Sequence, residues 1–146
     1  MPGFLPDTSC MVPAVCAWHE HHRAAQSELS RRLGDDEPML VAGPALVESY
    51  AVLTRLPRPH RLSARDAHRL IEASFVENGK VVALDGRAYR DLLTAMAAGG
   101  ISGGRAYDTV IAECALRERG VTLLTFNVDD FAPFATRGLA IVMPGR

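Results

Sequence analysis

The chain has 146 residues, 48% of them hydrophobic and 23% charged, which is enough for one core in a single domain spanning residues 1–146. Its net charge of −1 gives no sign of a nucleic-acid partner. No apolar run approaches the roughly 20 residues that span a bilayer, and no signal-peptide pattern is present. The three cysteines lack C-x-x-C spacing, so we expect reduced thiols in a cytoplasmic protein without a membrane segment.

Strand-like runs alternate with helical segments in the first half of the chain. Phe4-Leu5 predicts a short strand that Pro6 stops, because proline donates no hydrogen bond to a sheet. Apolar residues at three- and four-residue spacing predict one amphipathic helix over residues 14–33. Residues 39–42 predict a second strand, and the helix that follows is expected to end near Pro57.

The second half continues this alternation. Ser63, followed three residues later by Asp66, matches a capping box and predicts a helix that ends near Gly79. The later expected elements are a strand at 80–84, helices at 86–98 and 106–119, a strand at 121–125, a short helix at 131–135 and a strand at 139–142. This order predicts an α/β domain with three αβα layers around a mostly parallel central sheet.

Four acidic residues that are far apart in sequence stand beside these apolar runs. They are Asp7, Glu48, Asp108 and Asp130. An unpaired carboxylate buried there would be costly, so a shared cation is the natural compensation. Asp7 and Asp130 follow predicted strands, where open parallel sheets bind ligands, and the helix starts expected near Glu48 and Asp108 tolerate an anion. We therefore expect all four to meet at one edge of the sheet.

Basic residues gather between Arg55 and Arg69, where Asp66 is the one acid. Arginine is a good phosphate ligand because its planar guanidinium can bond two oxygens at once. Arg55, Arg58 and Arg61 are the candidates for such contacts. A solvated helix face explains the same cluster equally well.

Four motifs follow one another along nearly the whole chain: Asp7-Thr8-Ser9, Glu48 with Leu53-Thr54-Arg55, Tyr107-Asp108-Thr109-Val110-Ile111-Ala112, and Thr125-Phe126-Asn127-Val128-Asp129-Asp130-Phe131. Their order and spacing resemble those of PIN-domain nucleases, and of VapC-like toxins above all. The resemblance implies a PIN-like fold and an endoribonuclease that depends on Mg²⁺, with Mn²⁺ as a substitute. It also implies a homodimeric toxin that inhibits translation and growth and is neutralised by a VapB-type antitoxin.

The resemblance also implies a role for each motif residue. Asp7 and Asp108 would bind the metal directly, and Glu48 and Asp130 would complete the catalytic set. The residues expected to orient these ligands or the phosphate are Thr8, Ser9, Thr125 and Asn127. A ligand set made only of oxygen suits Mg²⁺, which keeps several waters, and metal-assisted hydrolysis of RNA needs little else from a protein. The candidate RNA-binding residues are Arg55, Arg58 and Arg61.

Two details of this assignment stay open. Asp129 and Asn127 compete with Asp130 for the fourth position, because many relatives carry aspartate where this chain has Asn127. Pro2 and Pro6 shorten the first strand, so Asp7 is expected to be less rigidly held.

A second dense group contains cysteine and histidine. Its members are Cys10, Cys16, His19, His21 and His22. Their spacing is not that of a common structural zinc site, so His19 and His21 are expected in solvent and Cys16 in the core.

Other interpretations remain at this point. Trp18, Tyr50, Leu53 and Leu56 fit either the core or an interface with a partner. The functional alternatives are a metal-dependent DNA nuclease and a non-catalytic PIN-like module that binds nucleic acid, and metal-independent RNA binding would favour the module.

Overall fold

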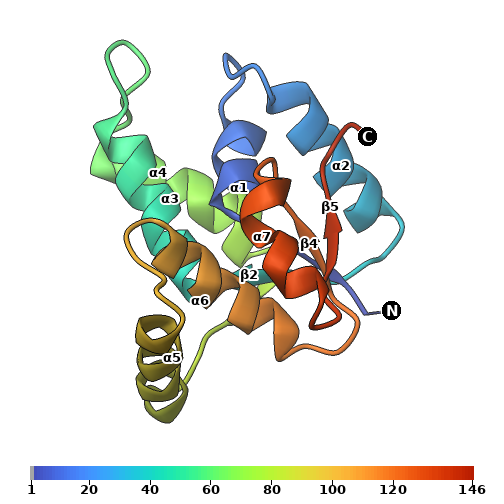
Figure 1. Cartoon of the computed structure of the whole chain (residues 1–146). Coiled ribbons are helices and arrows are strands. Elements are labelled where there is room, and N and C mark those ends of the chain that lie inside the picture. The colour runs from blue at the N-terminus through green and yellow to red at the C-terminus, as the bar shows by residue number, and fades with distance from the viewer. Residues whose placement is uncertain (1) are drawn as a thin grey trace.

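Five parallel strands form one sheet in the computed structural model, which describes residues 2–146 (Figure 1). Their order is β3-β2-β1-β4-β5, so the first strand of the chain lies at the centre. The strands are β1 (Phe4–Pro6), β2 (Met39–Ala42), β3 (Gly79–Val82), β4 (Thr122–Leu124) and β5 (Ala140–Val142). Strands β1 and β2 are buried along their whole length, as expected where helices cover both faces of a parallel sheet.

Helices connect the strands and complete the predicted three-layer αβα fold, which is confirmed. They are α1 (Thr8–Val15), α2 (His22–Gly34), α3 (Gly43–Arg55), α4 (Ala64–Ile71), the π-helical turn η1 (Glu72–Val76), α5 (Gly86–Ala98), α6 (Arg105–Leu116) and α7 (Val128–Ala135). Between residues 2 and 146, no helix is long and apolar enough to cross a membrane.

One predicted helix is in fact two. The spacing predicted a single helix over residues 14–33, but α1 ends at Val15 and α2 begins only at His22. The first helix starts early because the Asp7 carboxylate accepts a hydrogen bond from the Cys10 amide (3.2 Å), which caps its N-terminus. Aromatic rings in the intervening loop stack on two other loops, and local sequence spacing does not encode such long-range contacts.

Pro6 lies inside β1 rather than beyond its end. It pairs in register with Leu124 of β4, whereas β1 pairs with β2 only at Phe4 and Met39. The Phe4 amide bonds on the β2 side, to Pro38 (3.0 Å), and the Asp7 amide bonds on the β4 side, to Leu124 (3.0 Å). Because successive amides alternate between sides, Pro6 lacks its N–H on the β2 side, where pairing has already stopped.

Helices α3 and α4 form a hairpin whose connecting loop projects from one corner of the molecule (Figure 1). The predicted cap of α4 is confirmed, because the Asp66 amide donates to the Ser63 hydroxyl (3.1 Å). Arg58 and Arg61 lie in this loop and are exposed. The basic cluster therefore sits at the projecting end of the hairpin.

Candidate active site

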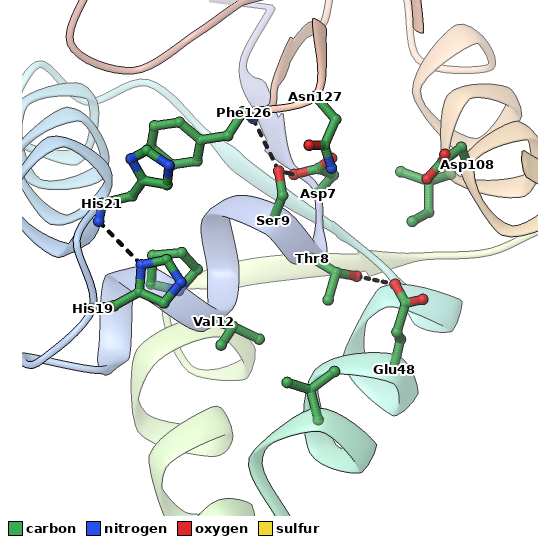
Figure 2. Close-up of a pocket in the computed structure, with 13 residues that line it drawn as sticks. Asp7, Thr8, Ser9, Val12, His19, His21, Glu48, Asp108, Phe126 and Asn127 are labelled. Atoms are coloured by element: carbon green, nitrogen blue, oxygen red, sulfur yellow. Dashed lines mark hydrogen bonds between the residues drawn. The ribbon is translucent and has the colours of Figure 1, made fainter. Parts of the chain in front are cut away.

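A pocket of about 430 Å³ opens beyond the ends of β1 and β4, and three acids from different elements line it (Figure 2). Asp7 immediately precedes α1, Glu48 comes from α3 and Asp108 from the first turn of α6. Strands β1 and β4 are hydrogen-bonded neighbours, which brings the first and last motifs of the chain to the same place. Three of the four predicted acids therefore share one pocket.

Asp7 is the buried acid of this pocket, with 3% of its surface exposed. Its Oδ1 accepts hydrogen bonds from the Ser9 hydroxyl (2.6 Å) and the Cys10 amide (3.2 Å), and its Oδ2 accepts one from the Thr125 hydroxyl (2.6 Å). The expectation that nearby prolines leave Asp7 loosely held is wrong, because these bonds fix the side chain and the bond to Leu124 fixes the backbone.

The two hydroxyls that bind Asp7 are themselves held by backbone amides. The Phe126 amide donates to the Ser9 hydroxyl oxygen (2.9 Å), and the Asn127 amide donates to the Thr125 hydroxyl oxygen (2.9 Å). Each hydroxyl that accepts from an amide can turn its own hydrogen toward the carboxylate. Ser9 and Thr125 therefore both donate hydrogen bonds to Asp7, and their role in orienting a metal ligand stays a prediction.

Glu48 is held from the opposite side of the pocket. The Thr8 hydroxyl donates a short hydrogen bond to Glu48 Oε1 (Figure 2). This contact joins the first turn of α1 to α3 and directs the half-buried Glu48 carboxylate toward the acids rather than along its own helix.

The pocket concentrates negative charge. Burial raises the pKa of Asp7 to about 6, even though its hydrogen bonds act in the other direction, and repulsion from Asp108 raises it further. Burial also raises the pKa of Asp108, as does repulsion from Asp130 and Glu48, against a smaller opposing effect of Arg105. Every ion pair found in residues 2–146 uses an acid elsewhere in the chain.

The fourth predicted acid, Asp130, lies beside the acidic pocket and does not line it. Helix α7 begins at Val128, earlier than expected, so Asp129 and Asp130 are exposed in its first turn and line a neighbouring hollow. Asn127 lines both hollows. Asp130 is still close enough to Asp108 to raise the pKa of that residue. Of the three candidates for the fourth position, only Asn127 lines the pocket of Asp7, and only Asp130 raises the pKa of Asp108.

Sequence reasoning missed part of the pocket wall. His19 and His21, expected in solvent, line the pocket, as does Phe126. The ring of His21 stacks on that of Phe126, with centroids 4.2 Å apart and planes at 11°. The density of histidines near residue 20 indicated a candidate site. The stacking of His21 on Phe126 could not be predicted, because Phe126 lies far along the chain. Cys16 is buried, as expected.

The PIN domain family model matches residues 4–135. The chain belongs to the PIN-domain family. Ribonuclease VapC40 of Mycobacterium tuberculosis is 38% identical over 120 residues, covering 82% of this chain and 83% of that protein. Ribonuclease VapC27 of the same species is 34% identical over 118 residues, covering 81% and 80%. This PIN domain is therefore a VapC-like member of the family.

Solved structures share the fold at low sequence identity. DNA-bound VapBC from Salmonella typhimurium has a TM-score of 0.67 at 21% identity, covering 98% of both chains. VapC20 of Mycobacterium tuberculosis, described as a sarcin–ricin loop cleaving toxin, has a TM-score of 0.66 at 16% identity, covering 90% of this chain and 95% of that one. At these identities the match shows the fold alone.

The acids of this PIN domain fit a Mg²⁺ ion that keeps much of its water. Within residues 2–146, no three His, Cys, Asp or Glu side chains gather closely enough to enclose an ion directly. Mg²⁺ is commonly held by one or two carboxylates and several waters, so a complete protein cage is not needed. Among residues 2–146, Oδ2 of Asp7 accepts a hydrogen bond from Thr125 alone, which leaves a lone pair for a metal.

The predicted RNA-binding arginines do not line the pocket of this PIN domain. Arg55 ends α3, and Arg58 and Arg61 lie in the loop beyond it, all three exposed. The Nε of Arg61 donates a hydrogen bond to the Leu56 carbonyl oxygen (2.9 Å). Their role in RNA binding stays a prediction.

Proposed function

We propose that this VapC-like PIN domain is an endoribonuclease that depends on Mg²⁺, with Mn²⁺ as a substitute. One observation carries the proposal most strongly: a buried Asp7, fixed by hydroxyls from both ends of the chain, shares an acidic pocket with Asp108 and Glu48. Repulsion between these acids favours a cation at this point. The ribonuclease names of the relatives supply the substrate class.

In this proposal the residues of the chain act mainly by positioning. Asp7 and Asp108 would hold a Mg²⁺ ion, which would supply Lewis acidity for the attacking water and positive charge opposite the leaving oxygen of the phosphodiester. The Ser9 and Thr125 hydroxyls keep the Asp7 carboxylate in one orientation. Glu48, held by Thr8, orients water on the opposite side of the pocket. The fourth position, Asp130 or one of its rivals, completes the set.

Cleavage of total cellular RNA tests this function directly. Purified protein would be incubated with Mg²⁺, Mn²⁺ or EDTA, with the Asp7→Asn variant and a single-stranded DNA substrate in parallel. We expect discrete RNA fragments that need both metal and Asp7, and intact DNA. Cleavage of DNA would favour the DNA nuclease instead, and RNA binding without metal or cleavage would favour the non-catalytic module.

We further propose that the protein is the homodimeric toxin of a toxin–antitoxin pair, which inhibits translation and growth until a VapB-type antitoxin binds. Several structural neighbours are VapBC complexes, and an apolar hollow of about 250 Å³ on α3 and α4 offers a binding surface. Val47 and Tyr50 are exposed there, whereas Leu53 belongs to the core. Light scattering should give about twice 15.8 kDa, and a monomer at all concentrations would contradict the dimer.

Thr125→Val should lower metal affinity and cleavage by about 10- to 100-fold, as loss of a group that orients a metal ligand commonly does. Valine fills nearly the same volume in this fully buried position but removes the hydrogen bond to Asp7 Oδ2 and the acceptor for the Asn127 amide. Thr94→Val is the matched control, because the Thr94 hydroxyl donates to the Arg90 carbonyl of its own helix and Thr94 does not line the acidic pocket. Calorimetric Mg²⁺ titration that does not separate Thr125→Val from wild type would contradict this role.

A further inference from the structure

Five rings form a continuous series beside the acidic pocket. In order, they belong to Phe126, His21, His19, Trp18 and His60. Both end pairs are stacked, Phe126 with His21 at 4.2 Å and Trp18 with His60 at 4.1 Å between centroids, and the intermediate steps are 5.6 Å. Three loops contribute these rings: the α1–α2 loop, the β4–α7 loop and the α3–α4 loop.

The rings are accessible, unlike those of an ordinary core cluster. Trp18 is 47% exposed and the His21 side chain 44% exposed, and the other three are partly buried. A large aromatic surface left open beside a pocket is a feature of binding sites rather than of a packed interior.

The series of rings lies between two surfaces of opposite charge, the acidic pocket and the arginines of the α3–α4 loop. At one end, His19, His21 and Phe126 line the same pocket as the acids (Figure 2). At the other end, His60 lies in the α3–α4 loop between Arg58 and Arg61. A strand with a phosphate at the acids and another at the arginines would therefore pass its bases over the rings.

We propose that this series of rings is a stacking platform for unpaired bases of the RNA strand that is cut at Asp7 and Asp108. The inference rests on the proposed ribonuclease function and adds a binding site for the substrate strand beyond the acids, made of the five rings that contact its unpaired bases. Unpaired bases stack on aromatic and histidine rings, whereas the bases of a duplex are already stacked on one another and are not presented. The platform thus selects accessible single strands over helical regions.

His19 adds a polar contact to this platform. The His21 amide donates to Nδ1 of His19 (3.0 Å), so in the neutral ring the proton is on Nε2. Burial lowers the pKa of His19, as does the charge of His21, which keeps the ring neutral at pH 7. A neutral ring with one N–H donor can stack on a base and donate to an acceptor on a base edge.

Trp18 is the chain's single tryptophan, so its fluorescence reports directly on the platform. The experiment uses an Asp7→Asn background, which prevents cleavage in this proposal, and a short single-stranded RNA. Its two comparison probes are the same oligomer with abasic positions and the same sequence in a duplex. We expect the single strand to quench Trp18 and to bind more tightly than either comparison probe.

Substitutions separate stacking from a purely structural role. His21→Ala should weaken binding of the single strand by about five-fold or more, which is the usual effect of removing one stacking ring, and His21→Tyr should restore it. His68→Ala is the control, because His68 is an exposed residue of α4 outside the series of rings. Melting temperatures measured in parallel show whether the rings only hold the three loops together.

Two outcomes would contradict the platform. One is unchanged Trp18 fluorescence when RNA is added. The other is that the parent protein and His21→Ala bind RNA with equal affinity, and that each binds normal and abasic RNA equally, even if His21→Ala melts at a lower temperature. Failure of the ribonuclease proposal is a separate result. Wild-type protein that quenches on RNA but never cleaves it would retain the platform as a single-strand binding surface and reject the catalytic role.

Discussion

Asp108→Asn is expected to lower metal-dependent RNA cleavage by about 10²- to 10³-fold, because the stabilisation that a metal gives to developing charge amounts to several kcal/mol. Asparagine has nearly the same shape as aspartate but is a neutral and weaker metal ligand. Asp108 is half-buried in the first turn of α6 and faces repulsion from Asp130 and Glu48, so loss of its charge should not weaken the fold. Initial cleavage rates on a defined RNA and Mg²⁺ titration by calorimetry measure the effect.

Asp91→Asn provides the matched control, since Asp91 is an exposed residue of α5 and does not line the acidic pocket. It should cleave RNA and bind Mg²⁺ like the wild type. If Asp108→Asn retained wild-type cleavage with an intact Mg²⁺ titration, Asp108 would not be a metal ligand, and the arrangement proposed for the pocket would have to change.

Much of the fold follows from local sequence patterns. The strand at residues 39–42 and the helix at 86–98 have the predicted bounds, because the Asp85 cap and Gly99 delimit that helix and an unbroken apolar run marks the buried strand. Local sequence patterns gave the wrong bounds where contacts between distant residues determine the structure. The break between α1 and α2 accompanies the stacking of His21 on Phe126 and of Trp18 on His60.

For the acidic pocket, the sequence predicted some of the acids that meet there but not the contacts that support them. Asp7 and Asp108 could be grouped in advance because strand ends and helix starts in a parallel sheet meet at one edge. Glu48 was expected near a helix start but lies beyond the first turn of α3, from where it still lines the pocket. The support given to Asp7 by Thr125 could be named only through the family resemblance, since the contact depends on the pairing of β1 with β4. Asp130 was harder to place because α7 starts at Val128, which turns the exposed Asp129 and Asp130 toward a second hollow.

Metal-free protein should become less stable as the pH rises from about 4 to 7, and Asp7 should be a main cause. Its pKa is about 6 in the folded protein against an ordinary 3.8, so folding favours the protonated carboxyl. This contribution is complete below pH 3.8 and is lost as the pH rises through about 6. The difference between the two pKa values corresponds to about 3 kcal/mol of unfolding free energy.

Asp7→Asn should remove this pH dependence and, in EDTA at pH 7, raise the free energy of unfolding by up to about 3 kcal/mol. Urea denaturation of both proteins between pH 4 and pH 8 measures it, and the difference between the two curves cancels groups that titrate equally in both. Adding Mg²⁺ at pH 7 should then stabilise wild type more than Asp7→Asn, because the ion binds the folded state through the carboxylate. Parallel curves in EDTA would show that Asp7 is ionised at little cost, and an equal response to Mg²⁺ would place the ion elsewhere. Together the two measurements separate the cost of burying a charge at Asp7 from the use of that charge for binding metal.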